Sequence, residues 1–164
     1  ELWHAQERGD FPVVGVSWHE ACAYCRWRSR VTGLQVRLPT RKEWEFAASP
    51  DGRMYPWGNE EPTPERANYG GLTGTLTPVG SYPLGAGVFG HQDLAGNVSE
   101  WCKDADKTPT RELSWGRRHI LKGGSWWEAS VGTLGSTDYG YGYSKTRYDY
   151  RGFRIAVSDV SDTG

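Results

Sequence analysis

The sequence contains little cysteine, almost no net charge and no long apolar run. Its three cysteines are Cys22, Cys25 and Cys102. Cys22 and Cys25 lie three residues apart on a predicted helix, which is poor geometry for a disulfide, and a zinc site would need a further ligand from far along the chain. We therefore interpret all three as small buried hydrophobic residues.

The charge balance argues against nucleic acid as a partner. A net charge of −1 and a pI near 6.5 provide no basic field. No apolar run approaches the roughly 20 residues that a membrane span requires. No signal peptide is recognised at Glu1. The sequence leaves the localisation open, and display on a cell or virion surface is compatible with it.

Aromatic side chains and turn-forming residues are abundant instead. Aromatic residues make up 13% of the chain, including nine tryptophans, and there are 22 glycines and 9 prolines. Because tryptophan buries a large area per residue, this composition predicts an ordered but loop-rich fold. A length of 164 residues suits one core, and we predict a single domain spanning residues 1–164.

Two short helices are predicted from their capping signals. Ser17 and Glu20 form a capping box before a helix over residues 18–29. Thr40 and Glu43 form another before a helix over 41–48. Gly33 is the expected stop of the first helix.

Strand signals are short and scattered. Apolar strands are expected at 119–122 and 153–157, with a third ending at Trp101, and residues 11–16 are read as a strand or an extended entry. Residues 60–90 match no regular pattern and should form ordered loops. These elements predict an α+β fold with two helices, small antiparallel sheets and long loops.

The segment from Gly123 to Arg154 is the most unusual part of the sequence. It contains five of the nine tyrosines, mixed with Gly, Ser, Thr and Asp. Tyrosine with small polar residues is the composition of antibody contact loops, in which tyrosine supplies rigid amphipathic area. We therefore predict a rigid scaffold that displays this segment as a binding surface, with its variable part at about 126–150.

Ten residues of the segment are expected to be exposed on one face and to contact a ligand. In an extended chain Trp127 points away from Trp126, which we assign with Phe153 to the core. The ligand is a protein, a peptide or a glycan, and the sequence does not choose among them. The ten residues are Trp127, Glu128, Ser130, Val131, Asp138, Tyr139, Tyr141, Tyr143, Tyr148 and Tyr150.

Motifs along most of the chain carry a resemblance to a known family. In order, they are VVGVSWHEACAYCRW, RLPTRKEWEFAA, YPWGNE, ANYGG, TPVGSYP, DLAGNVSEW, LKGGSW and GFRIAV. Together they resemble the formylglycine-generating-enzyme-type (sulfatase-modifying) family over residues 11–157. The resemblance implies a loop-rich variant of the C-type lectin fold. The strands that usually precede the first helix in this family are not recognised in residues 1–10.

The fold by itself does not assign a function, because one scaffold hosts many kinds of site. Formylglycine-generating members use two cysteines between GGSW and GFR, and this interval contains none here. Related sulfoxide synthases hold iron through histidines of an additional helical domain, and the four histidines of this chain, His4, His19, His91 and His119, show no facial-triad spacing. An enzyme-related or enzyme-accessory domain of these types remains the alternative interpretation.

Within the family, the chain resembles most the variable proteins of diversity-generating retroelements. These proteins place their diversified residues between GGSW and GFR, and mutagenesis at template adenines produces mainly Tyr, Asp, Ser, Gly and similar residues. The same residue types fill this interval here, with Gly140 and Gly142 among the tyrosines. The resemblance implies a non-catalytic ligand-binding protein with a diversified surface. A generic lectin-like module is also compatible with the sequence.

The resemblance also implies a structural calcium site at Asp93, Gly96, Val98 and Glu100. Two side chains and two main-chain carbonyls would supply oxygens there, and calcium takes roughly six to eight. The alternative is that Asp93 caps a turn while Glu100 pairs with a buried arginine such as Arg154. No other cofactor is expected.

Overall fold

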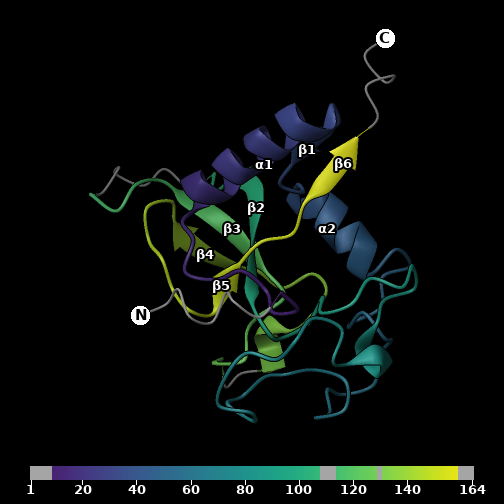
Figure 1. Ribbon diagram of the computed structural model, residues 1–164. Coiled ribbons are helices and arrows are strands. Elements are labelled where there is room, and N and C mark those ends of the chain that lie inside the picture. Colours follow the sequence, from purple (N-terminus) through teal and green to yellow (C-terminus); the bar gives the residue numbers. More distant parts are fainter. Residues whose placement is uncertain (1–8, 108–113, 129–130, 159–164) are drawn as a thin grey trace.

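The computed structural model describes residues 9–107, 114–128 and 131–158. Two helices and small sheets, joined by long loops, confirm the α+β prediction (Figure 1). No helix in the described ranges is long and apolar enough to cross a membrane. The elements are α1 (Trp18–Thr32), β1 (Gln35–Arg37), α2 (Arg41–Ala48), η2 (Pro83–Gly85), β2 (Ser99–Ala105), β3 (Arg118–Lys122), η3 (Val131–Thr133), β4 (Gly140–Tyr143), β5 (Arg151–Gly152) and β6 (Ala156–Ser158).

Both helices begin at the predicted capping boxes. The Ser17 hydroxyl accepts the amide of Glu20 at 3.3 Å, and the Glu20 carboxylate accepts the amide of Ser17 at 2.8 Å. Thr40 and Glu43 repeat this arrangement before α2. α1 continues beyond the predicted range and stops at Gly33, whose φ of 74° is the left-handed conformation that closes many helices.

The strands form two sheets, and one pairing differs from the expected pattern. β1 pairs with β6, and the larger sheet has the order β4-β3-β2-β5. All pairs are antiparallel except β2 and β5, which run parallel and make the larger sheet mixed. The Tyr-rich segment (residues 123–154) therefore leaves the sheet after β3, returns as the edge strand β4 beside β3, and then adds β5 beside β2.

Several strand predictions need correction. The strand expected to end at Trp101 instead begins at Ser99 and continues to Ala105. The strand expected at 153–157 is displaced, because β6 spans only Ala156–Ser158. Residues 11–16 form no strand, and Gly15 among them has a positive φ, whereas the strand at 119–122 is confirmed within β3. An apolar run marks burial, but a strand also needs a hydrogen-bonded neighbour, and the sequence pattern does not reveal that neighbour.

The two helices pack on opposite faces of the larger sheet. Trp101 and Leu121 belong to a buried cluster with α1. Their sequence neighbours Cys102 and Ile120 belong to a cluster with α2. Because side chains alternate between the two faces of a strand, β3 and the first half of β2 are covered on both sides, which explains the continuous burial of 99–102 and 119–122.

A third cluster supports the long loops at 60–90. Buried Asn97 has a φ of 61°, its amide donates to the Asn68 carbonyl at 2.8 Å, and its side-chain oxygen accepts the amide of Thr77 at 3.1 Å. Leu134, from the Tyr-rich segment, packs with Tyr55 in the buried cluster beside these loops. The loop region therefore contacts the segment predicted to bind a ligand.

Candidate functional site

The start of the Tyr-rich segment, residues 126–128, is held by backbone hydrogen bonds. The amide of Trp126 donates to the Asn97 carbonyl at 3.0 Å. The carbonyls of Trp126 and Glu128 accept the amides of residues 71 and 70, at 2.7 and 3.0 Å. Trp127 points outward between these contacts and is 63% exposed. Residues 126–128 thus combine a fixed main chain with the exposed side chain of Trp127.

The middle of the segment is anchored in the core. Leu134 is fully buried, and the amide of Ser136 donates to the Met54 carbonyl at 2.7 Å. Val131, which begins the short helix η3, is exposed. Ser130 was also predicted to contact ligand, and it lies outside the described residues.

The two faces of the strand β4 differ in what they can accommodate. Tyr141 lies opposite Ile120 of β3, so its side chain projects on the α2 side of the sheet. Gly142 alternates with it, and a Cβ at Gly142 would approach the indole of Trp101 closer than 3.0 Å, on the α1 side. Glycine is among the residue types expected from diversification, but the structure leaves no room for a side chain at Gly142.

Two tyrosines form a ring pair beside α2. The rings of Tyr139 and Tyr141 lie 5.4 Å apart and nearly perpendicular. The guanidinium of Arg41 lies 3.9 Å from the Tyr139 ring centre, and that of Arg118 lies 4.7 Å from the Tyr141 ring centre. A hydrogen bond from Tyr141, together with the charge of Arg41, lowers the pKa of Tyr139. A cavity of 670 Å³ lies against this pair, between the first turn of α2 and the end of β2.

A second ring pair lies farther along the segment. Tyr148 and Tyr150 have ring centres 5.1 Å apart, and the guanidinium of Arg151 lies 4.4 Å from the Tyr148 ring. Burial lowers the pKa of Arg151. The Arg151 side chain also borders the space against Gly142, so this pair belongs to the α1 side of β4. Guanidinium groups thus lie over the rings of both pairs and help to hold them in place: Arg41 and Arg118 for the first pair, and Arg151 for the second.

The structure places the predicted contact residues unevenly. Glu128, Tyr143 and Tyr150 are only partly exposed, whereas Trp127, Val131, Asp138, Tyr139, Tyr141 and Tyr148 are exposed. The two ring pairs lie on different sides of β4, so the surface has two aromatic clusters instead of one continuous face. In the described part of the chain, no ring contact joins Trp127 to either pair.

Glu128 and Arg151 border a small cavity between these clusters. The cavity has a volume of 60 Å³. Glu128 Oε2 and Arg151 Nε are both buried and have no protein partner. A space of this size with two polar walls suits an ordered water that would bridge the two side chains.

The residues predicted to bind calcium take part in other contacts. The two carboxylate oxygens of Glu100 accept hydrogen bonds from Arg154 Nε at 2.5 Å, Arg154 Nη2 at 2.7 Å and Trp44 Nε1 at 2.7 Å. Asp93 Oδ2 accepts the amide of Gly80 at 2.7 Å, and burial raises the pKa of Asp93. The alternative interpretation from the sequence, in which Glu100 pairs with Arg154, matches this geometry.

Glu100 in this arrangement does not fit a calcium ion. The Arg154 guanidinium already supplies the positive charge, and neither carboxylate oxygen is left without a donor. Across the described ranges, no group of three or more His, Cys, Asp or Glu side chains could hold a metal ion. The carbonyls of Gly96 and Val98 would have to bind calcium without this carboxylate.

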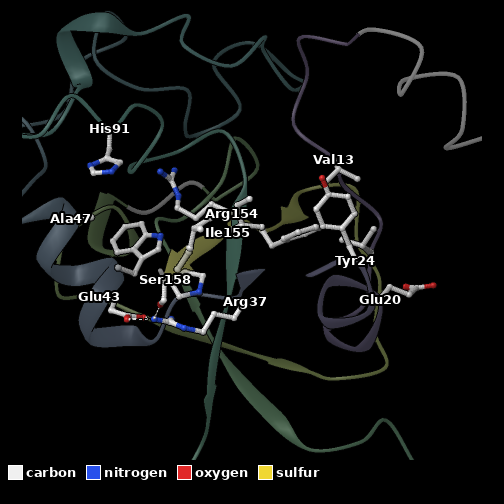
Figure 2. A pocket seen from close by; sticks show the side chains of 16 residues that line it. Val13, Glu20, Tyr24, Arg37, Glu43, Ala47, His91, Arg154, Ile155 and Ser158 are labelled. Atoms are coloured by element: carbon white, nitrogen blue, oxygen red, sulfur yellow. Dashed lines mark hydrogen bonds and ion pairs between the residues drawn. The ribbon is translucent and has the colours of Figure 1, made fainter. Parts of the chain in front are cut away.

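A separate apolar groove was not predicted from the sequence. It has a volume of 910 Å³ and lies between α1, α2 and the strand β6. Figure 2 shows Tyr24 and Val13 at one end of this groove, and Ala47 and His91 at the other. The apolar run at 153–157, in which Ile155 and Val157 are exposed, lines the groove and is the signal that could have indicated it.

The cations beneath the rings were also missed. Two of them, Arg41 and Arg118, are distant in sequence from the tyrosines that they contact. The third, Arg151, lies near the end of the segment. No periodic pattern in the sequence marks any of them. Only their distances to the tyrosine rings identify them.

Comparison with known proteins supports the family resemblance. The chain matches the family described as "Sulfatase-modifying factor enzyme 1-like domain" over residues 2–159. It is 38% identical to hercynine oxygenase of Mycobacterium tuberculosis over 71% of this chain and 30% of that protein. It is 36% identical to inactive C-alpha-formylglycine-generating enzyme 2 of Bos taurus over 78% of this chain and 42% of that protein. The chain thus spans less than half the length of these relatives.

A solved structure shares the fold. Treponema denticola variable protein 1 superposes with a TM-score of 0.70 at 23% identity, covering 90% of this chain and 71% of that one. The predicted C-type-lectin-like fold is therefore confirmed. Since the family match covers nearly the whole chain, this chain belongs to the sulfatase-modifying factor enzyme 1-like domain family.

Proposed function

We propose that this domain is a non-catalytic binding module that contacts its ligand through the exposed tyrosines of the segment at 126–150. The observation that carries the proposal is the combination of exposed rings and a fixed backbone. Tyr139 and Tyr148 are 43% and 42% exposed, and a guanidinium lies within 4.5 Å of each ring centre. Rings held in place before binding lose little conformational freedom on binding.

The main chain of the segment supports the same proposal. Its contacts to residues 70–71, Asn97 and Met54 are made by backbone atoms. Substitution of the exposed side chains would therefore leave these contacts in place. A surface with this property can accept different side chains and recognise different ligands, as the variable-protein interpretation requires.

One relative and one structural neighbour support a non-catalytic module. One is named as an inactive formylglycine-generating enzyme, and a variable protein has the same fold. The interval between Gly123 and Arg154 contains neither cysteine nor histidine. We infer a protein, peptide or glycan ligand, bound without chemical conversion.

Selection of ligands for the intact domain tests this proposal. The immobilised domain is panned with a random-peptide phage library and, separately, probed with a glycan array. Affinities for enriched binders are then measured with Tyr139→Ala, Tyr141→Ala and Tyr148→Ala. Tyr24→Ala is the matched control, because Tyr24 is equally exposed but lines the apolar groove.

We expect at least one segment tyrosine to cost ~1–3 kcal/mol of binding free energy, as central aromatic contacts do. Tyr24→Ala should leave the affinity unchanged. Binders that depend on Tyr24 and on none of the three segment tyrosines would contradict the proposal, and so would a domain that enriches no binder from either library.

A second candidate is an enzyme-accessory role. The observation that favours it is the 38% identity to hercynine oxygenase, of which this chain covers 30%. In that case the domain would act as one part of a longer enzyme. Oxidation or sulfoxidation that a longer protein loses when this domain is removed, and that exceeds a metal-only background, would support the second candidate over the first.

A further inference from the structure

A buried, charged side chain lies directly beneath the Tyr-rich segment. Lys122 is the last residue of β3, and its side chain is completely buried. An ammonium group carries three donors and no acceptor, so burial without three acceptors would be costly. Burial also lowers the pKa of Lys122, and the neighbouring carboxylate of Glu45 opposes this shift.

Three acceptors surround the Lys122 ammonium. Glu45 Oε1 of α2 lies 3.1 Å from Nζ, and the carbonyl of Ser136 lies 2.9 Å from it. The third acceptor is the carbonyl of Asp138. The Trp44 ring centre, 5.0 Å away, covers the ammonium on a further side. The number of acceptors therefore equals the number of donors.

Two of these acceptors are main-chain atoms of the segment. The Asp138 side chain is exposed, and the Ser136 hydroxyl has no hydrogen-bond partner although it is buried. Neither side chain contributes to the contact with Lys122. The bonds to Lys122 would therefore survive replacement of these side chains.

The third acceptor connects Lys122 with the first ring pair. Glu45 Oε1 also accepts Arg41 Nε at 2.6 Å, and Arg41 stacks on Tyr139, the residue that follows Asp138. One ammonium thus reaches the backbone before Tyr139 and, through Glu45, the cation below its ring. Lys122 therefore bonds to groups on both sides of the 670 Å³ cavity: Glu45 on the α2 side, and the backbone next to Tyr139 on the other.

We propose that Lys122 is the positioning residue of the binding surface: it fixes the backbone at 136–141 through main-chain carbonyls and so presents Tyr139 and Tyr141 independently of the side chains that the segment carries. This inference rests on the proposed binding function. It explains how one scaffold tolerates different residues at exposed positions of the segment. The variable positions are those whose side chains do not take part in anchoring.

Hydrogen exchange of the intact domain, without any ligand, tests the role of Lys122. Lys122→Met retains the length of the side chain but removes the ammonium. Lys103→Met is the matched control, because Lys103 is an exposed lysine of the neighbouring strand β2. Amide exchange is compared at 136–141 and at 99–102, well below the melting temperature.

Lys122→Met should accelerate exchange at 136–141 by about tenfold or more, because hydrogen bonds to a charged donor are lost, while 99–102 exchange as before. Lys103→Met should change neither region. Equal acceleration in both regions, or none at 136–141, would overturn the proposal, since a general loss of stability affects the core strands as well.

Side-chain independence is tested in parallel. Ser136→Ala and Asp138→Ser should leave exchange at 139–141 within about twofold of the original protein. Acceleration by Asp138→Ser comparable to that by Lys122→Met would show that the side chain is the anchor and would refute the proposal. If Lys122→Met does not fold, Glu45→Gln replaces it, because glutamine cannot neutralise the ammonium. Acceleration confined to 136–141 then supports the proposal, and uniform or absent acceleration refutes it.

The exchange measurements test the role of Lys122, and the ligand selection tests the binding function, so either can fail without the other. Exchange at 136–141 needs no ligand, so the anchor can be refuted while tyrosine-dependent binding stands. Conversely, a domain that binds nothing could still show local exchange that depends on Lys122.

Discussion

Replacing Gly142 by alanine should destabilise the domain, whereas replacing Gly140 should not. Both glycines lie in β4, two residues apart, and neither has a positive φ. A Cβ at Gly142 would come closer than 3.0 Å to two atoms of the Trp101 ring. Trp101 is fully buried, and its Nε1 donates to the Val16 carbonyl at 3.0 Å, so the ring has little freedom to move. A Cβ at Gly140 meets no atom within 4 Å.

The expected difference follows from two opposing terms. Overpacking a filled core costs ~1–3 kcal/mol. Gly→Ala at an unstrained position instead stabilises by ~0.4–1 kcal/mol, because the unfolded chain has fewer conformations to lose. The free energies of unfolding of Gly142→Ala and Gly140→Ala should therefore differ by ~1.5–4 kcal/mol. For a chain of this size, that corresponds to roughly 3–15 °C in melting temperature.

Urea unfolding followed by tryptophan fluorescence, together with thermal melts of both variants, measures this difference. Gly140→Ser and Gly142→Ser extend the comparison to a residue type found elsewhere in the segment. If the 140 and 142 variants are equally stable, Trp101 does not form a rigid wall behind β4. Position 142 would then accept a side chain as readily as position 140.

Three further predictions concern other parts of the structure. Tyr139→Ala should change the free energy of unfolding by less than ~1 kcal/mol, whereas Leu134→Ala should cost ~2–5 kcal/mol. Similar losses for both variants in urea melts would contradict the division between exposed and anchoring residues. Burial lowers the pKa of His119 from 6.5 to about 4. The unfolded chain therefore binds the proton first, and stability should fall by ~2–3 kcal/mol as the pH drops from about 6.5 to 4. This loss should be absent in His119→Phe, and an unchanged pH profile would exclude His119 as its source. Glu100→Gln should cost ~3–5 kcal/mol by leaving the Arg154 charge without its partner, while melting curves in excess calcium and excess chelator should coincide. A higher melting temperature in calcium would instead support the predicted metal site.

The sequence by itself determined the local features of this protein. Both helix starts follow from Ser17 and Thr40 with a glutamate three residues later, and the caps form within those four residues. The end of α1 follows from Gly33, which adopts the left-handed conformation that other residues avoid. The ordered series of motifs was sufficient to recognise the family, because such motifs are a property of the sequence alone.

Only the tertiary structure decided which residues of the Tyr-rich segment are exposed and which are anchored. Gly142 resembles the other glycines of the segment in the sequence, and only the fold shows Trp101 behind it. In the sequence, Lys122 is only the last residue of a short strand. The fold shows that its ammonium donates to the carbonyls of Ser136 and Asp138. Glu100 could equally bind calcium or an arginine, and Arg154, 54 residues away, occupies it. Each of these contacts depends on which distant groups the fold brings together, and neither residue spacing nor composition encodes such distances.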